Sequence, residues 1–98
     1  MNYDLSIKLL NEEKHRLTGE LSWLKAEIKR ASIIADDFDN YDKYSLDALY
    51  HNYREPSEPA SIDKILSLIE KYKNRVNELE MEIEELGSAI NILSNKES

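Results

Sequence analysis

The fold is decided by the stretch from Ile62 to Leu93, which reads IDKILSLIEKYKNRVNELEMEIEELGSAINIL. Apolar side chains recur in it at spacings that alternate between three and four residues. The members of this stripe are Ile62, Ile65, Ile69, Tyr72, Val76, Leu79, Ile83, Leu86, Ile90 and Leu93. A period of 3.5 residues is typical of a helix that packs along its length against another helix. The stretch therefore predicts one long helix, which we place at residues 59–95.

A second helix with the same period is predicted at residues 4–35. Its stripe contains one polar member, Lys14, and reads Tyr3, Ile7, Leu10, Lys14, Leu17, Leu21, Leu24, Ile28, Ala31, Ala35 and Phe38. Two matched helices in one chain predict an all-α fold, a long antiparallel helical hairpin that is coiled-coil-like. We expect its seam to include Leu17, Leu21, Leu24, Ile28, Ile69, Val76, Leu79, Ile83, Leu86 and Ile90.

The apolar faces are wider than one neighbouring helix covers. Leu66, Leu68 and Ala89 flank the stripe of the last helix, while Leu9 and Trp23 lie beside the first, with Ile33 and Ile34 further along. A widened face indicates more than one neighbour. We expect either a short helix of the connection to fold back, or two hairpins to pair as a homodimeric bundle. A parallel dimer through residues 62–93 is also open, and it would bring Arg75 near Glu80 of the second copy.

Length and composition place limits on the class of protein. The chain has 98 residues, which predicts a single helical domain over residues 1–98. It contains no cysteine, only two glycines and two prolines, and 34 % charged residues. We find no signal-peptide pattern and no apolar run long enough for a membrane span, and predict a cytoplasmic protein. The formal charge of −7 argues against direct binding to nucleic acid or to an anionic membrane.

The connection, residues 36–58, is the most distinctive segment. It carries seven acidic residues against Lys43 and Arg54, which gives a net charge of −5. Ser45 begins a predicted short helix with an apolar face. Clustered carboxylates and tyrosines suit a basic, partly apolar surface on another protein. We therefore predict partner binding through Asp36, Asp37, Phe38, Asp39, Tyr41, Asp42, Tyr44, Asp47, Tyr50 and Tyr53, together with Trp23.

Catalytic and metal-binding patterns are weak in this sequence. The two histidines, His15 and His51, belong to different predicted elements and have no nucleophile or acid arranged beside them. The run from Asp37 to Asp42 begins like a calcium loop. It lacks the glycine that such a loop needs at its sixth position and the acid that it needs at its twelfth. We predict that the protein is not an enzyme and uses no cofactor or metal.

The predicted function is therefore a non-enzymatic protein-binding module that regulates or inhibits a macromolecular partner with a basic surface. One alternative is an inhibitor, carried by a virus or mobile element, of a host nucleic-acid enzyme. Such an inhibitor would resemble anti-CRISPR proteins or imitate the phosphates of DNA. Another alternative is a structural coiled-coil protein whose role is oligomerisation.

A third alternative comes from a family resemblance over roughly residues 17–55. The segments Glu20-Leu21, Trp23-Leu24-Lys25 and Tyr50-His51 resemble the coiled-coil arm of Gre-type transcript-cleavage factors. The resemblance implies an antiparallel hairpin whose tip carries acids that hold a metal ion inside RNA polymerase. The tip motif of that family is not matched, because Lys43, Leu46 and Leu49 stand where the alignment requires acids.

Overall fold

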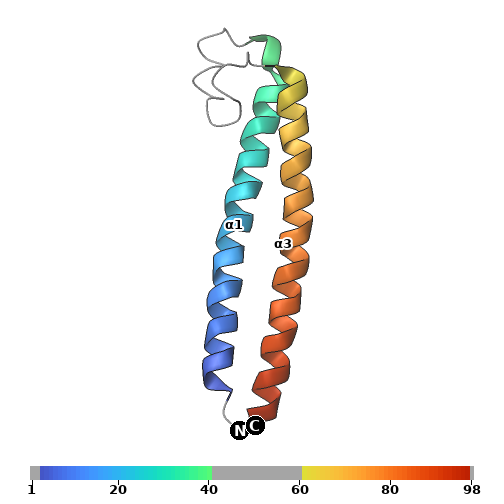
Figure 1. Ribbon diagram of the computed structural model, residues 1–98. Coiled ribbons are helices and arrows are strands. Elements are labelled where there is room, and N and C mark those ends of the chain that lie inside the picture. Colours follow the sequence, from blue (N-terminus) through green and yellow to red (C-terminus); the bar gives the residue numbers. More distant parts are fainter. Residues whose placement is uncertain (1–2, 41–60, 98) are drawn as a thin grey trace. The chain divides into compact units, whose positions relative to one another are not determined.

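A computed structural model describes residues 3–40 and 61–97, and every secondary-structure element in these ranges is helical. Helix α1 spans Asp4–Asp36, the 3-10 helix η1 spans Phe38–Asn40, and helix α3 spans Ile62–Glu97. α1 and α3 pack extensively against each other, as a helical hairpin requires (Figure 1). The predicted short helix that begins at Ser45 lies outside the described residues.

The helix ends follow from local hydrogen bonding. α3 begins three residues later than predicted, because Ser61 caps it. The Lys64 amide donates to Ser61 Oγ at 3.5 Å, and the Ile65 amide donates to the Ser61 carbonyl at 3.2 Å. A serine hydroxyl satisfies an amide that lacks a partner in the first turn of a helix. At the start of α1 the Tyr3 carbonyl accepts a hydrogen bond from the Ile7 amide at 2.9 Å.

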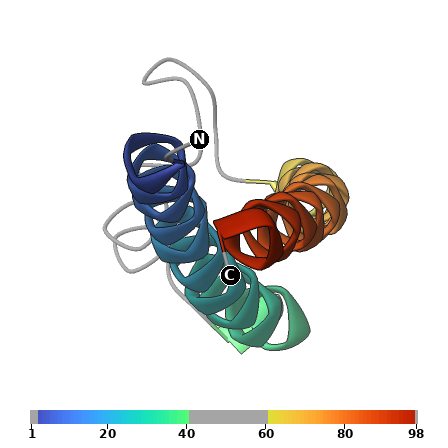
Figure 2. The ribbon, with the colours of Figure 1, turned by 90° about the horizontal axis from the view of Figure 1, so that it is seen from below.

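The chain divides into two compact units. Unit 1 contains Met1–Lys25 and Arg75–Ser98, and unit 2 contains Ala26–Asn74. Each unit therefore holds one segment of α1 and one segment of α3, which run in opposite directions. Figure 2 shows the same two helices from below. A single domain over residues 1–98 remains a prediction.

Unit 2 has a small core built from both helices. Ala31, Ile34, Ile65 and Ile69 are buried, and Ile28, Ala35 and Phe38 pack against them. The burial of Ile34 differs from the sequence-based expectation, which placed this residue beside the seam with Ile33. Ile34 is only 3 % exposed, whereas Ile33 is 54 % exposed. The contact face of α1 is thus one residue position wider than the heptad stripe.

Unit 1 is held together by Leu17, Leu24 and Leu79, which are buried; Leu79 is completely inaccessible to solvent. The other seam residues of this unit are half-buried, namely Leu21, Val76, Ile83, Leu86 and Ile90. Half-burial is expected where two helices alone share one seam, since each side chain has neighbours on one side only.

Two ion pairs across the helices show the register of unit 1. Arg75 Nε lies 3.1 Å from Glu20 Oε1, and Lys25 Nζ lies 3.4 Å from Glu80 Oε1. If seam positions are lettered a and d, Glu20 and Arg75 both occupy position g, while Lys25 and Glu80 both occupy position e. Pairs of equal letters arise in antiparallel packing, whereas parallel packing pairs g with e. Arg75 and Glu80, the two residues that a parallel dimer would pair, thus each bind α1 of their own chain.

Lys14, the polar member of the first stripe, is half-buried in the seam of unit 1. Its Nζ lies 3.7 Å from where a Cβ would stand on Gly87 of α3. A lysine at one seam position favours one register over others, because a shifted register would bury its charge against apolar side chains. Separately, none of the described helices is long and apolar enough to cross a membrane.

Candidate protein-binding surface

The structure places four of the predicted partner-binding residues together where α1 ends. Asp36 is the last residue of α1, Asp37 forms a turn, and Phe38 and Asp39 open η1. The three carboxylates are exposed, while the Phe38 side chain is half-buried against the core of unit 2. The packing of Phe38 therefore anchors the segment that carries the acids. The same residues line a surface hollow with Ala35 and Ile62.

The position of these acids is electrostatically unfavourable for α1. The carboxyl end of a helix carries a partial negative charge, which favours lysine or arginine in the last turn. The last turn of α1 contains no basic residue, and it ends on Asp36 with Asp37 directly after it. A local arrangement that works against the fold is commonly kept for function. The acids at this helix end therefore mark the surface as a candidate for binding a cationic group.

The other predicted site residues do not join this cluster in the described part of the chain. Tyr41, Asp42, Tyr44, Asp47, Tyr50 and Tyr53 lie outside the described residues. Trp23 belongs to unit 1 and is 55 % exposed. Partner binding through these seven side chains remains a prediction.

A network of charges in unit 1 was not foreseen from the sequence. Arg75 lies 3.1 Å from Glu78 and 3.7 Å from Glu82, in addition to its bond with Glu20. The hydrogen bonds that Arg75 donates to Glu20, and then to Glu78, raise the pKa of Arg75 above its usual value. Arg16 is bonded in the same way to Glu13. The sequence shows glutamates at successive g positions of α1. Which residue of α3 they meet depends on the register of the two helices, which the sequence alone did not provide.

Tyr72 is the one tyrosine of the predicted α3 seam. Its burial raises the pKa of the phenol, and the negative charge of Glu27 adds to the shift. A buried phenol next to a carboxylate is more costly to ionise than an exposed one, since the phenolate loses hydration and gains a like charge. Tyr72 is thus a packing residue whose protonation matters only at alkaline pH.

His15 is exposed on α1 and lines a surface hollow with Lys8, Asn11 and Glu12. Neither buried acid nor nucleophile accompanies it there. Across residues 3–40 and 61–97, no three histidines, cysteines or acids gather closely enough to hold a metal ion. The chemistry that the described surface offers is charge and apolar contact.

No protein-family model matches the chain, and neither the curated proteins nor the solved structures include a significant match to it. The resemblance to Gre-type factors therefore rests on the quoted residues alone.

Proposed function

We propose that this chain is a non-enzymatic protein-binding module that regulates or inhibits a macromolecular partner with a basic surface. The observation that carries the proposal is the exposed set Asp36, Asp37 and Asp39 at the end of α1, anchored by Phe38 and without a basic residue in the last helical turn. A basic partner would neutralise both the carboxylates and the partial charge of the helix end. Binding would add a cation at a helix end whose last turn contains no basic residue.

The connection carries further negative charge in the sequence that follows these acids. Residues 40–58 hold four more acids against Lys43 and Arg54, a net charge of −2, so the sequence that follows the described acids is also negative. A surface of this kind also suits an inhibitor that occupies the nucleic-acid site of an enzyme, with carboxylates in place of phosphates. We keep that mode of action as one form of the proposal, since a nucleic-acid enzyme is one kind of basic partner.

The test separates binding from stability. We would replace Asp36, Asp37 and Asp39 with lysine, and compare this variant with a control that replaces Glu12, Glu70 and Glu84 with lysine. All six acids are exposed, so both variants undergo the same change of net charge at different places. A tagged chain first isolates its partner from a lysate at low salt, and titration calorimetry with the purified partner then compares the variants.

The expected result is that the Asp36, Asp37 and Asp39 variant loses binding but unfolds no more easily than the original chain, since lysines suit the end of α1. The control variant should retain most of the affinity. Equal losses in the two variants would mean that net charge alone drives the interaction. Full binding by the first variant would rule out this surface.

Self-association is a second candidate function, and the size of the core supports it. In the described residues only seven apolar side chains are buried: Leu17, Leu24, Ala31, Ile34, Ile65, Ile69 and Leu79. A core this small gives a marginal monomer, which pairing of two hairpins would stabilise. Sedimentation equilibrium tests it: a dimer mass with a concentration-dependent melting temperature supports the homodimer, and a monomer mass with an unchanged melting temperature excludes it.

A further inference from the structure

The exposed apolar side chains of unit 1 lie on one side of their helices. Five large ones are more than half exposed: Leu5, Leu9, Trp23, Met81 and Ile92. All five occupy heptad positions c and f. The corresponding outer positions b and e in this unit carry polar side chains or glycine, among them Lys8, Asn11, His15, Thr18, Asn77, Glu84, Gly87 and Asn91. This one-sided distribution differs from the scattered exposed apolar residues of an ordinary surface.

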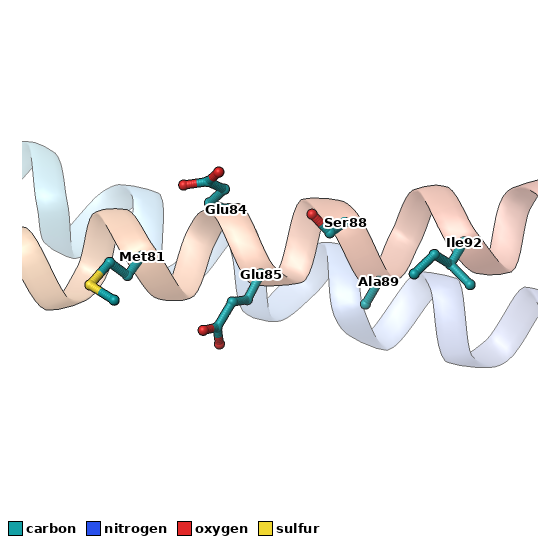
Figure 3. A pocket seen from close by; sticks show the side chains of 6 residues that line it. All are labelled: Met81, Glu84, Glu85, Ser88, Ala89 and Ile92. Atoms are coloured by element: carbon teal, nitrogen blue, oxygen red, sulfur yellow. The ribbon is translucent and has the colours of Figure 1, made fainter.

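The two of these side chains that belong to α3, Met81 and Ile92, line a surface hollow. Met81, Glu85, Ala89 and Ile92 follow one another at spacings of three or four residues, so they lie along one stripe of the helix. Glu84 and Ser88 complete the lining. Figure 3 shows Met81, Glu85 and Ala89 on one edge of the helix, Glu84 and Ser88 on the other, and Ile92 about one turn beyond Ala89. The stripe covers three turns, a length of about 17 Å.

The hairpin does not need these side chains for its own packing. The neighbouring seam residue Leu79 is completely buried, whereas Met81 is 62 % exposed and Ile92 is 56 % exposed. The apolar surface of Met81 and Ile92 is therefore available to a further element, and covering it would remove that surface from water.

The charges around the hollow indicate what kind of element fits. Three glutamates of the acidic run bind within unit 1: Glu78 and Glu82 contact Arg75, and Glu80 contacts Lys25. Glu85 lies within the stripe, between Met81 and Ala89, whereas Glu84 lies on the opposite edge of the helix (Figure 3). Neither forms an ion pair with any of the described residues. They are both exposed, so their charge is free to attract a cation brought by a partner.

We propose that the hollow formed by Met81, Ala89 and Ile92 docks a basic amphipathic helix of another protein. The apolar side chains of that helix would contact Met81, Ala89 and Ile92, and lysines or arginines next to them would reach Glu84 and Glu85. A straight stripe over three turns suits a helix better than an irregular loop. A second copy of the chain fits less well, because stacking this face on itself would bring the two glutamates of each copy close to their equivalents.

This surface is separate from the acidic end of α1. It lies in unit 1, whereas Asp36, Asp37 and Asp39 lie in unit 2. The proposal therefore goes beyond the proposed function, and each fails or succeeds without the other: changes at the hollow leave those aspartates unaltered.

The test uses the full chain and a synthetic probe. The probe is a fluorescently labelled leucine–lysine peptide of about 14 residues, long enough for three turns, with leucines on one face of the helix. Anisotropy titrations at low salt should give saturable binding, whereas a peptide with glutamate in place of lysine should not bind. Met81→Ser with Ile92→Ser should weaken binding at least tenfold. Glu84→Gln with Glu85→Gln should weaken it severalfold and reduce its salt dependence.

Matched controls lie in unit 2. Ile33→Ser with Leu66→Ser removes two equally exposed apolar side chains, and Asp63→Asn with Glu70→Gln removes two exposed acids. Both controls should bind the peptide within twofold of the original chain. Equal weakening by controls and hollow variants would overturn the proposal, and so would absence of binding. A dimer of the original chain that dissociates with Met81→Ser and Ile92→Ser would assign the hollow to a second copy instead.

Discussion

Replacing Leu79 with alanine tests the described core most directly. Leu79 is the largest side chain in the described residues that is fully buried, and it lies where the two segments of unit 1 meet. The change removes three carbon atoms from a site without solvent access. At about 0.8 kcal/mol for each buried methylene, the lost transfer free energy is roughly 2.4 kcal/mol.

The cavity left behind adds to this cost. Leucine-to-alanine changes in buried sites typically lose about 2–5 kcal/mol, and the loss depends on how far the surroundings close the gap. A two-helix unit can close more readily than a layered core, so we expect a loss of about 2.5–3.5 kcal/mol. The total stability of a chain of this size is on the order of 5–15 kcal/mol. The melting temperature should accordingly fall by at least about 10 °C.

Urea unfolding followed by far-ultraviolet circular dichroism measures the loss, with Leu9→Ala and Leu66→Ala as controls. These leucines are 55 % and 51 % exposed, so the same chemical change should cost each about 1 kcal/mol or less. The measurement is repeated at two protein concentrations, because a dimer would make the midpoint concentration-dependent. If Leu79→Ala and Leu9→Ala lowered stability to within about 0.5 kcal/mol of each other, the described burial of Leu79 would be wrong.

Three further predictions concern single positions. Gly19→Ala and Gly87→Ala should each stabilise the chain by about 1 kcal/mol in urea titrations. An added Cβ would meet nothing within 4 Å at Gly19, and at Gly87 only the end of the flexible Lys14 side chain at 3.7 Å. A loss of stability in Gly87→Ala would mean that the helices are closer there than described. Ala31→Leu should cost about 1–3 kcal/mol, because Ala31 is fully buried between the helices, and a neutral result would contradict that close packing. Tyr72 has a pKa above that of the unfolded chain, so the folded form holds its proton more tightly. Its contribution is therefore complete below about pH 10 and is lost as the pH rises through the higher pKa of the folded form. Tyr72→Phe should show a smaller fall in urea midpoint between about pH 9 and pH 11 than the original chain; identical profiles would exclude the shift.

The sequence by itself determined the helices and their main contact faces. Alternating spacings of three and four residues predicted helices at 4–35 and 59–95, and the structure has them at Asp4–Asp36 and Ile62–Glu97. This works because the period of the apolar side chains is a property of one helix, independent of its neighbour. The acids at the end of α1 were also predicted, because helix-breaking residues and charged residues can be read from the sequence directly.

Only the tertiary structure determined which side chains of the two helices contact one another. The burial of Ile34, the bond between Arg75 and Glu20, and the pair of Lys25 with Glu80 all require the antiparallel register, which both seams left open. In this register some glutamates of α3 form ion pairs, whereas Glu84 and Glu85 do not. The hollow beside Met81 could therefore be identified only from the structure. The physical reason is that a heptad pattern specifies a face of a helix, whereas direction and register arise from the pairing energies of two such faces together.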